Sequence, residues 1–94
     1  MIEFTAIEQA HQRIRPYINE TPVVTSHLLN QWLGHEIYFK AECLQKIGAF
    51  KSRGGCNAVQ QLLQVYPNVK RIVANSSGNH AQAVSYHGNK LGFD

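Results

Sequence analysis

Lys46-Ile47-Gly48-Ala49-Phe50-Lys51-Ser52-Arg53-Gly54-Gly55 is the stretch that decides how the chain is organised. A strand-like apolar run at residues 37–41 precedes it, and a helix-like run at residues 57–63 follows it. Its glycines tolerate a positive φ and let the backbone approach a ligand closely. Lys51 can attack a carbonyl if its ammonium is partly desolvated or lies near other positive charge, which Lys46 and Arg53 could supply. The alternative is an ordinary surface lysine on a turn.

This stretch is not a P-loop. A P-loop places two glycines around four residues directly before Lys-Ser or Lys-Thr, so that successive backbone amides surround the phosphates. Here Lys51-Ser52 follows Ala49-Phe50, and the glycine spacing is different. The sequence therefore argues against nucleotide hydrolysis.

The composition is that of a small globular domain. The chain has 94 residues, of which 44% are hydrophobic and 16% are charged. It has no apolar run long enough to span a bilayer and no pattern of a secretory signal, so we expect no membrane association. Cys43 and Cys56 have neither metal-site spacing nor disulfide density, which predicts reduced thiols in a cytoplasmic protein. The net charge of +3 is mild, and it favours an anionic ligand over a nucleic acid.

Hydrophobic periodicity predicts alternating helices and strands. Thr5-Ala6-Ile7-Glu8 has the form of a capping box, for a helix that Pro16 ends. Ser26 is expected to cap a second helix, which stops at Gly34. The other expected elements are an extended segment at 20–24, a strand at 35–42, a helix ending at Pro67, a strand at 69–74 and a helix ending at Leu91. This alternation predicts an α/β fold with a parallel sheet and right-handed crossovers.

A second stretch with chemical potential is Asn75-Ser76-Ser77-Gly78-Asn79-His80, between the expected strand at 69–74 and the last helix. Free amides and the positive end of the helix dipole converge at such a helix start, where a carboxylate or phosphate oxygen can bind. The alternative is that Ser, Asn and Gly act only as helix caps. Two such positions at the carboxyl ends of strands in one α/β unit favour a ligand site.

The histidines do not predict a metal site. His11, His27, His35 and His87 are scattered along the chain, and no pair has the i,i+4 spacing of a helical metal site. His80 has an alternative reading as a first-turn residue whose ring makes a local hydrogen bond.

Both stretches together resemble one family. The segment from Gln45 to Gly55 resembles the lysine motif of the fold-type II pyridoxal 5'-phosphate (PLP) enzymes. Ser76-Ser77-Gly78-Asn79-His80-Ala81-Gln82 resembles the loop with which that family holds the substrate carboxylate. The His-Ala-Gln continuation is similar to the branch of threonine/serine dehydratases (threonine ammonia-lyases) and serine racemases. Thr21-Pro22-Val23 and Phe39-Lys40-Ala41-Glu42 also match, so the resemblance covers nearly the whole chain.

The resemblance implies roles for six residues and for one cofactor, PLP. Lys51 would bind PLP covalently and act as the base on one face of the substrate Cα. Phe50 would pack on the pyridine ring, and Asn79 would bond its phenolic oxygen. The substrate carboxylate would be held by Ser76, Ser77, Asn79 and His80. Ser77 occupies the place of the proton carrier on the opposite face in the racemases. No metal ligand is implied within the chain.

The fold implied by the resemblance is a fragment of the tryptophan synthase β-like architecture, a parallel sheet with flanking helices. Residues 1–63 would form the N-terminal part of the large PLP domain, and residues 64–94 the start of the small substrate-binding domain. The implied activity is deamination of L-threonine or L-serine to a 2-oxo acid and ammonia, in a cytoplasmic homo-oligomer, with isoleucine biosynthesis among its pathways. Serine racemase is the alternative within the family. A non-catalytic remnant that binds small anions and, more weakly, a nucleic-acid-binding fragment are alternatives outside it.

Some positions depart from the family pattern. Ser52 stands where an aliphatic residue is common, and Gly55 where alanine is common. The ATP contacts of the racemases are matched at Glu8, Ser26, Lys46 and Gln82, whereas His27 and Ile47 replace hydroxyl residues. Family members continue well beyond the position of Asp94, and their glycine-rich phosphate loop lies in that continuation. We therefore expect a truncated product that binds PLP weakly, has no dehydratase activity alone and self-associates through exposed apolar faces.

Overall fold

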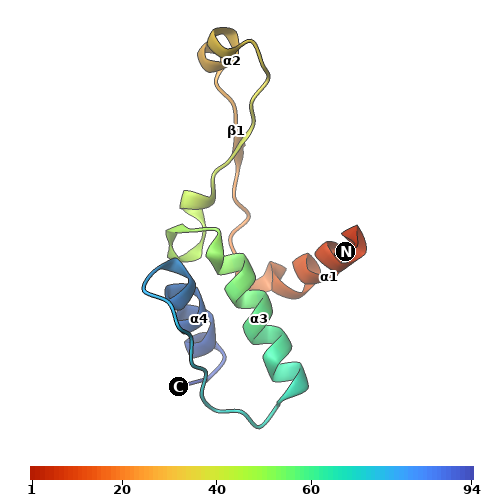
Figure 1. Cartoon of the computed structure of the whole chain (residues 1–94), viewed down its shortest axis with the longest axis vertical. Coiled ribbons are helices and arrows are strands. Elements are labelled where there is room, and N and C mark those ends of the chain that lie inside the picture. The colour runs from red at the N-terminus through yellow and green to blue at the C-terminus, as the bar shows by residue number, and fades with distance from the viewer.

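Helices make up most of the structure, a computed structural model that describes residues 1–94 (Figure 1). The elements are, in chain order, α1 (Phe4–Ile14), the 3-10 turn η1 (Arg15–Tyr17), β1 (Val23–Val24), α2 (His27–Leu33), β2 (Phe39–Lys40), the 3-10 turns η2 (Glu42–Leu44) and η3 (Lys46–Gly48), α3 (Lys51–Val65) and α4 (Asn79–Lys90). Helices α1, α3 and α4 form a body, and the segment from β1 to β2 projects from it as an arm (Figure 1). None of the helices is long and apolar enough to cross a membrane.

The tip of the arm is α2, whose two ends lie where the sequence predicts them. The Ser26 hydroxyl accepts a hydrogen bond from the Leu29 amide at 3.3 Å, so Ser26 caps the helix. The helix ends at Gly34, which has a φ of 69°. Glycine adopts this left-handed conformation at low cost because it has no Cβ.

The single sheet is antiparallel, so the predicted parallel sheet is not confirmed by the strands of this chain. Val23 lies opposite Lys40, and Val24 lies opposite Phe39. The strand predicted at residues 35–42 is reduced to Phe39–Lys40, because only these residues pair with a neighbouring strand. The apolar run in this region thus belongs to an exposed two-stranded arm and not to a sheet covered on both faces.

The strand predicted at residues 69–74 is also absent, although one parallel-type contact exists there. The Asp94 amide donates to the Lys70 carbonyl at 2.9 Å, and the Ile72 amide donates to the Asp94 carbonyl at 3.3 Å. Two bonds of this pattern form one rung of a parallel ladder. A strand needs successive rungs, and the described residues supply only this one.

The core lies between α3 and α4. Its fully or nearly fully buried residues include Cys56 and Val59 of α3 and Ala83 of α4. Gly55 lies so close to α4 that a Cβ at this position would be 2.7 Å from the Cβ of Ala83. Glycine therefore permits an approach of the two helices that any larger residue would prevent.

Helix α1 differs from the prediction at its start but not at its end. It begins at Phe4 with Glu3 at the N-cap position, and no side chain caps it. The predicted capping box at Thr5 is therefore wrong, because Thr5 already lies inside the helix. The helix ends at Ile14, shortly before Pro16, as predicted.

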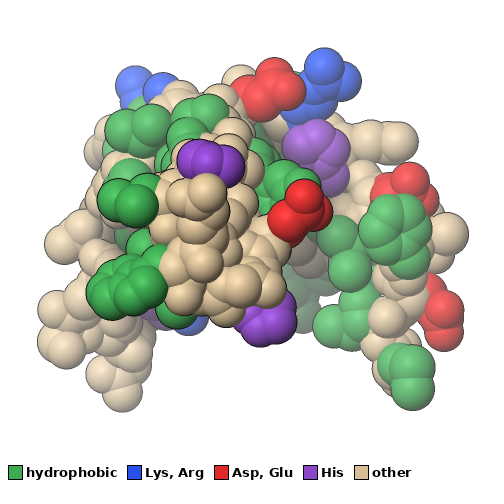
Figure 2. All heavy atoms as spheres, turned by 90° about the horizontal axis from the view of Figure 1, so that it is seen from above, with side chains coloured by type: hydrophobic (Ala, Val, Ile, Leu, Met, Phe, Trp, Pro, Cys, Tyr) green, Lys and Arg blue, Asp and Glu red, His purple; other side chains and the backbone are tan.

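The chain is less compact than a free-standing domain of its size. Its radius of gyration is 16.2 Å, whereas a compact domain of this length has about 12 Å. Its accessible surface is 7183 Å², whereas about 5,500 Å² is typical for this mass. Figure 2, which views the molecule from the arm's end, shows hydrophobic side chains at the surface. Those exposed on the arm are Val23, Val24, Leu28, Trp32, Leu33, Tyr38 and Phe39.

Candidate functional site

Lys51 is the first residue of α3. The sequence predicted a loop lysine followed later by a helix, but the helix already begins at Lys51. It begins there because the Ser52 and Arg53 amides donate to the carbonyls of Ala49 and Phe50, at 3.2 and 3.0 Å. The Lys51 side chain is exposed, and its Nζ lies 5.5 Å from the centre of the Phe50 ring, which is 62% exposed. The amine and the ring face are thus both accessible to a ligand.

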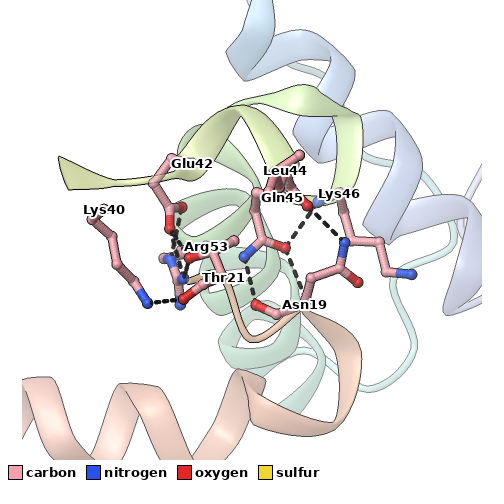
Figure 3. A network of polar contacts seen from close by, with 8 residues as sticks. All are labelled: Asn19, Thr21, Lys40, Glu42, Leu44, Gln45, Lys46 and Arg53. Carbon is pink, nitrogen blue, oxygen red and sulfur yellow. Dashed lines mark hydrogen bonds and ion pairs between the residues drawn. The ribbon is translucent and has the colours of Figure 1, made fainter. Parts of the chain in front are cut away.

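The loop before Lys51 is held by Gln45, whose side chain is buried (Figure 3). The Gln45 Oε1 accepts hydrogen bonds from the amides of Asn19 and Lys46, at 2.9 and 2.8 Å. The Gln45 Nε2 donates to the Asn19 carbonyl at 2.8 Å, and the Asn19 side chain donates to the Leu44 carbonyl at 3.0 Å. Three of these four bonds, those that involve Asn19, connect the loop to the segment that follows η1, and the fourth lies within the loop.

A second polar network holds the first turn of α3 (Figure 3). The Arg53 guanidinium donates to both carboxylate oxygens of Glu42, at 2.9 and 2.8 Å, and to the Thr21 hydroxyl at 3.1 Å. The Thr21 hydroxyl donates to Glu42 at 2.6 Å, and Lys40 Nζ donates to the Thr21 carbonyl at 2.6 Å. The hydrogen bond from Arg53 is the main cause that lowers the pKa of Glu42 to about 2, despite the opposing effect of burial.

This pairing corrects the expectation that Arg53 places free positive charge near Lys51. The charge of Arg53 is neutralised by Glu42. Lys46 lines a cavity of roughly 280 Å³ together with His87 of α4. The structure therefore gives Lys51 an anchored backbone, and Arg53 does not provide it with an unpaired positive charge.

The backbone between Gln45 and Lys51 makes a tight left-handed turn. Ile47 has a φ of 61° and Gly48 a φ of 71°. This conformation is costly for a β-branched residue such as Ile47, typically by about 1–3 kcal/mol. The Gln45 bonds on one side and the start of α3 on the other retain the turn despite this strain.

The start of α4 has the features of an anion site. No side chain caps the helix, so the predicted alternative of simple capping by Ser76, Ser77 or Asn79 is not observed. The Ser76 hydroxyl instead accepts a hydrogen bond from the Gly78 amide at 3.2 Å, outside the helix. Ser77, Asn79 and His80 are exposed. The first-turn amides thus have no capping side chain, and the side chains of Ser77, Asn79 and His80 are accessible to an oxyanion.

The six predicted site residues lie at or just before the starts of two helices that pack together. Ser52, next to Lys51, contacts His87 of α4, and Gly55 contacts Ala83. His80 lines a cavity of roughly 360 Å³ with residues of α3 and of the 72–75 segment, and no other predicted site residue lines it. The roles of Lys51, Phe50, Ser76, Ser77, Asn79 and His80 in catalysis and binding remain predictions.

Sequence reasoning missed the polar residues that support this arrangement. Gln45 belongs to the lysine motif, but the two hydrogen bonds that join it to Asn19 span 26 positions of sequence. Ser52 and His87 are buried, although both are polar. One signal was present: Ser52 lies four residues before Cys56, and His87 four residues after Ala83, so each shares a buried helix face.

Comparisons with known proteins identify the family of the chain. A family described as "Pyridoxal-phosphate dependent enzyme" matches residues 14–94. A serine racemase from Arabidopsis thaliana is 53% identical over 83 residues, which cover 88% of this chain and 25% of the racemase.

Two solved structures are similar in fold and in sequence. A pyridoxal 5'-phosphate-dependent aspartate racemase superposes with a TM-score of 0.93 at 39% identity, over 99% of this chain and 30% of its own. A threonine deaminase from T.th. superposes with a TM-score of 0.85 at 41% identity, over 98% of this chain and 32% of its own. The chain thus spans about a quarter to a third of the length of the proteins it matches.

Proposed function

The chain belongs to the family of pyridoxal-phosphate dependent enzymes, and from this premise we propose that it forms the N-terminal part of a threonine/serine dehydratase, inactive by itself. The reaction is deamination of L-threonine or L-serine to a 2-oxo acid and ammonia. The observation that supports this proposal best is the exposed Lys51 amine at the start of α3, where Gln45 holds the preceding loop and the Arg53–Glu42 pair holds the first helical turn. Catalysis of this kind needs an amine on a fixed backbone, because proton transfer depends on position.

The residues present fit PLP by the chemistry of their groups. Lys51 offers a primary amine for the aldehyde, and the neighbouring Phe50 offers an exposed ring face for the pyridine. Asn79 offers a neutral amide donor for the phenolic oxygen. When bound, PLP supplies the electron sink that makes the substrate Cα proton acidic.

The substrate carboxylate is expected to bind at the start of α4. The uncapped first-turn amides and the positive helix end favour an anion there. The hydroxyls of Ser76 and Ser77 and the side chains of Asn79 and His80 supply further donors. This placement fixes the Cα of the amino acid relative to the two faces from which protons are removed or returned.

The chain's own residues then carry the proton steps. The Lys51 amine takes the proton from the Cα, and the β-hydroxyl leaves with a proton as water. The resulting enamine takes up water and releases ammonia, which leaves the 2-oxo acid. The net change is loss of ammonia from the amino acid, with water lost and regained, so no external oxidant or reductant is needed.

Serine racemisation is the second candidate. The supporting observations are the exposed Ser77 at the start of α4 and the similarity to the Arabidopsis thaliana serine racemase. In this reaction Lys51 would act on one face of the Cα and Ser77 on the other. A small-anion-binding remnant without catalysis would use the Ser76–His80 segment alone. In either enzyme, we assign residues 1–63 to the large domain and 64–94 to the small domain, within a cytoplasmic homo-oligomer.

The proposal is tested by covalent labelling. The 94-residue chain is mixed with PLP, reduced with borohydride to make the PLP–lysine bond permanent, and digested for mass spectrometry. We expect the label on Lys51, and we expect it to disappear in Lys51→Ala but not in Lys40→Ala. Equal labelling of all lysines, or labelling that avoids Lys51, would contradict the proposal.

The two reactions are separated by their products. In the Arabidopsis thaliana serine racemase, the matching segment is replaced by this chain. The amounts of 2-oxo acid and D-serine that the resulting protein forms from L-serine are then measured. A rise in the proportion of 2-oxo acid favours the dehydratase, whereas an unchanged or lower proportion favours the racemase. Release of 2-oxo acid by the 94-residue chain alone would contradict the expectation that it is inactive by itself.

A further inference from the structure

A buried hydrogen bond connects the helix of Lys51 to the helix of Asn79. The Ser52 Oγ and the His87 Nε2 are 2.7 Å apart. Ser52 has no accessible surface, and His87 is 3% exposed. Ser52 directly follows Lys51 in the first turn of α3, and His87 lies two turns after Asn79 in α4.

The surroundings of His87 disfavour its charged form. Burial lowers the pKa of His87, and the positive charge of Lys46 in η3 lowers it further, whereas a hydrogen bond with the backbone of Ser52 acts in the opposite direction without cancelling these two effects. The groups that line the same cavity are Tyr17, Lys46, Gln60, Tyr86 and Lys90, and none of them is acidic. The Tyr86 ring meets the imidazole edge-on, at 5.0 Å between ring centres. A proton added to His87 would therefore have no buried carboxylate as a partner.

A second contact between α3 and α4 defines a point about which α4 can tilt. Gly55 and Ala83 lie against one another between the two helices, since a Cβ at Gly55 would be 2.7 Å from the Cβ of Ala83. Ala83 lies four residues after Asn79 and four residues before His87, a distance of about 6 Å along the helix on each side. If the Ser52–His87 bond opens, α4 can tilt about the Gly55–Ala83 contact. The Asn79 end must then move in the direction opposite to the His87 end, because the helix is rigid.

We propose that Ser52 and His87 are positioning residues, whose hydrogen bond sets the distance between Lys51 and the Asn79–His80 turn, and that protonation of His87 releases this setting. The inference depends on the proposed function for its catalytic meaning. Neither side chain is assigned a contact with the substrate or with PLP. The arrangement predicts that acid moves the start of α4 before it unfolds the chain.

The alternative is that the pair only fills space between the helices. The two readings differ in a measurable way, because a filler can be replaced by apolar groups of similar volume without changing any response to pH. The double variant Ser52→Ala/His87→Leu makes this replacement. Ser52→Thr keeps a hydroxyl at the same position and serves as the conservative variant.

The first experiment is an NMR titration of the 94-residue chain. The imidazole nitrogens of His87 and the backbone amides of Asn79 and Ala81 are followed from pH 8 downwards. We expect part of the change in the amide chemical shifts to follow the pH midpoint at which His87 is protonated, both in the natural chain and in Ser52→Thr. This part should be lost in Ser52→Ala/His87→Leu.

The second experiment follows borohydride trapping of PLP on Lys51 as a function of pH. We expect the His87-linked inflection to be present in the natural chain and in Ser52→Thr, and absent in the double variant. The proposal is overturned if the chemical shifts of the Asn79 and Ala81 amides do not follow the His87 midpoint in the folded natural chain. This measurement needs no variant to fold. If the amides follow His87 but PLP never labels Lys51, the positioning inference stands and the proposed function fails.

Discussion

The guanidinium of Arg53 binds the carboxylate of Glu42 through two hydrogen bonds, of 2.9 and 2.8 Å, two residues after Lys51. The same guanidinium donates to the hydroxyl of Thr21, which precedes β1, while Glu42 follows β2. The base of the arm and the first turn of α3 are therefore joined by one ion pair. A charge-assisted contact in this geometry is stronger than a hydrogen bond between neutral groups.

Loss of this ion pair should change the response of stability to acid. The folded chain holds Glu42 ionised down to a pKa of about 2, whereas an unperturbed glutamate protonates near 4.5. Because the folded-state pKa is lowered, the stabilisation is present above pH 4.5 and is lost as the pH falls towards 2. We expect Glu42→Gln to lower the free energy of unfolding at pH 7 by about 1–2 kcal/mol, since the pair is partly exposed. Urea unfolding at pH 7, 4.5 and 2.5 measures this.

The matched control is Glu36→Gln, because Glu36 is an exposed carboxylate on the arm. The difference in stability between the natural chain and Glu42→Gln should shrink towards zero between pH 4.5 and 2. A difference that is constant over this range would show that Glu42 contributes nothing through its charge.

Gly55→Ala should weaken the contact between α3 and α4. The added Cβ would be 2.7 Å from the Cβ of Ala83 and 3.2 Å from its carbonyl carbon, so one helix must move. We expect a loss of about 1–3 kcal/mol in stability, as for other overpacked cores. Gly54→Ala is the control, because nothing lies within 4 Å of a Cβ at that helical position. It should gain up to about 1 kcal/mol, and equal effects of the two changes would refute this account of the interface.

Gln45→Ala should release the loop before Lys51. The change removes the acceptor of the Asn19 and Lys46 amides and the donor to the Asn19 carbonyl. Leaving such groups unpaired costs about 1–3 kcal/mol. We also expect slower trapping of PLP on Lys51, measured at pH 7 in the absence of urea, where the chain is folded. Gln61→Ala, at an exposed position of α3, should change neither property; the interpretation fails if both variants trap PLP at the natural rate.

The arm should drive self-association. Its tip exposes 76% of Leu28 and 81% of Trp32, the one tryptophan of the chain. Exposed apolar area of this kind is stabilised by contact with a second surface. We expect Trp32 fluorescence to shift to shorter wavelength, and the light-scattering mass to rise, as the protein concentration increases. Leu28→Lys should suppress both changes, and a natural chain that stays monomeric with unshifted fluorescence would contradict the prediction.

Local chemistry in the sequence was sufficient to locate several features. Ser26 and Gly34 bound α2, and Pro16 follows the end of α1, because caps and prolines act on their own backbone neighbours. The two motifs around Lys51 and Asn79 predicted the PLP family, and the match over residues 14–94 confirms it. The capping box at Thr5 failed because a helix start depends on the residues that precede it as well as on the box itself.

The predictions that failed concern elements that need a pairing partner elsewhere in the sequence. A strand exists only where another strand supplies its hydrogen bonds, so the apolar runs at 35–42 and 69–74 could not by themselves decide between a parallel sheet, a short hairpin and no strand. The sequence alone predicted the family and both ends of α2, and it singled out Lys51 as the reactive amine, which stays a prediction. Only the tertiary structure decided that Arg53 is neutralised by Glu42, that Gln45 holds Asn19 and that Ser52 meets His87. These pairings join residues 11 to 35 positions apart, and such contacts depend on how helices and loops pack and not on local propensity.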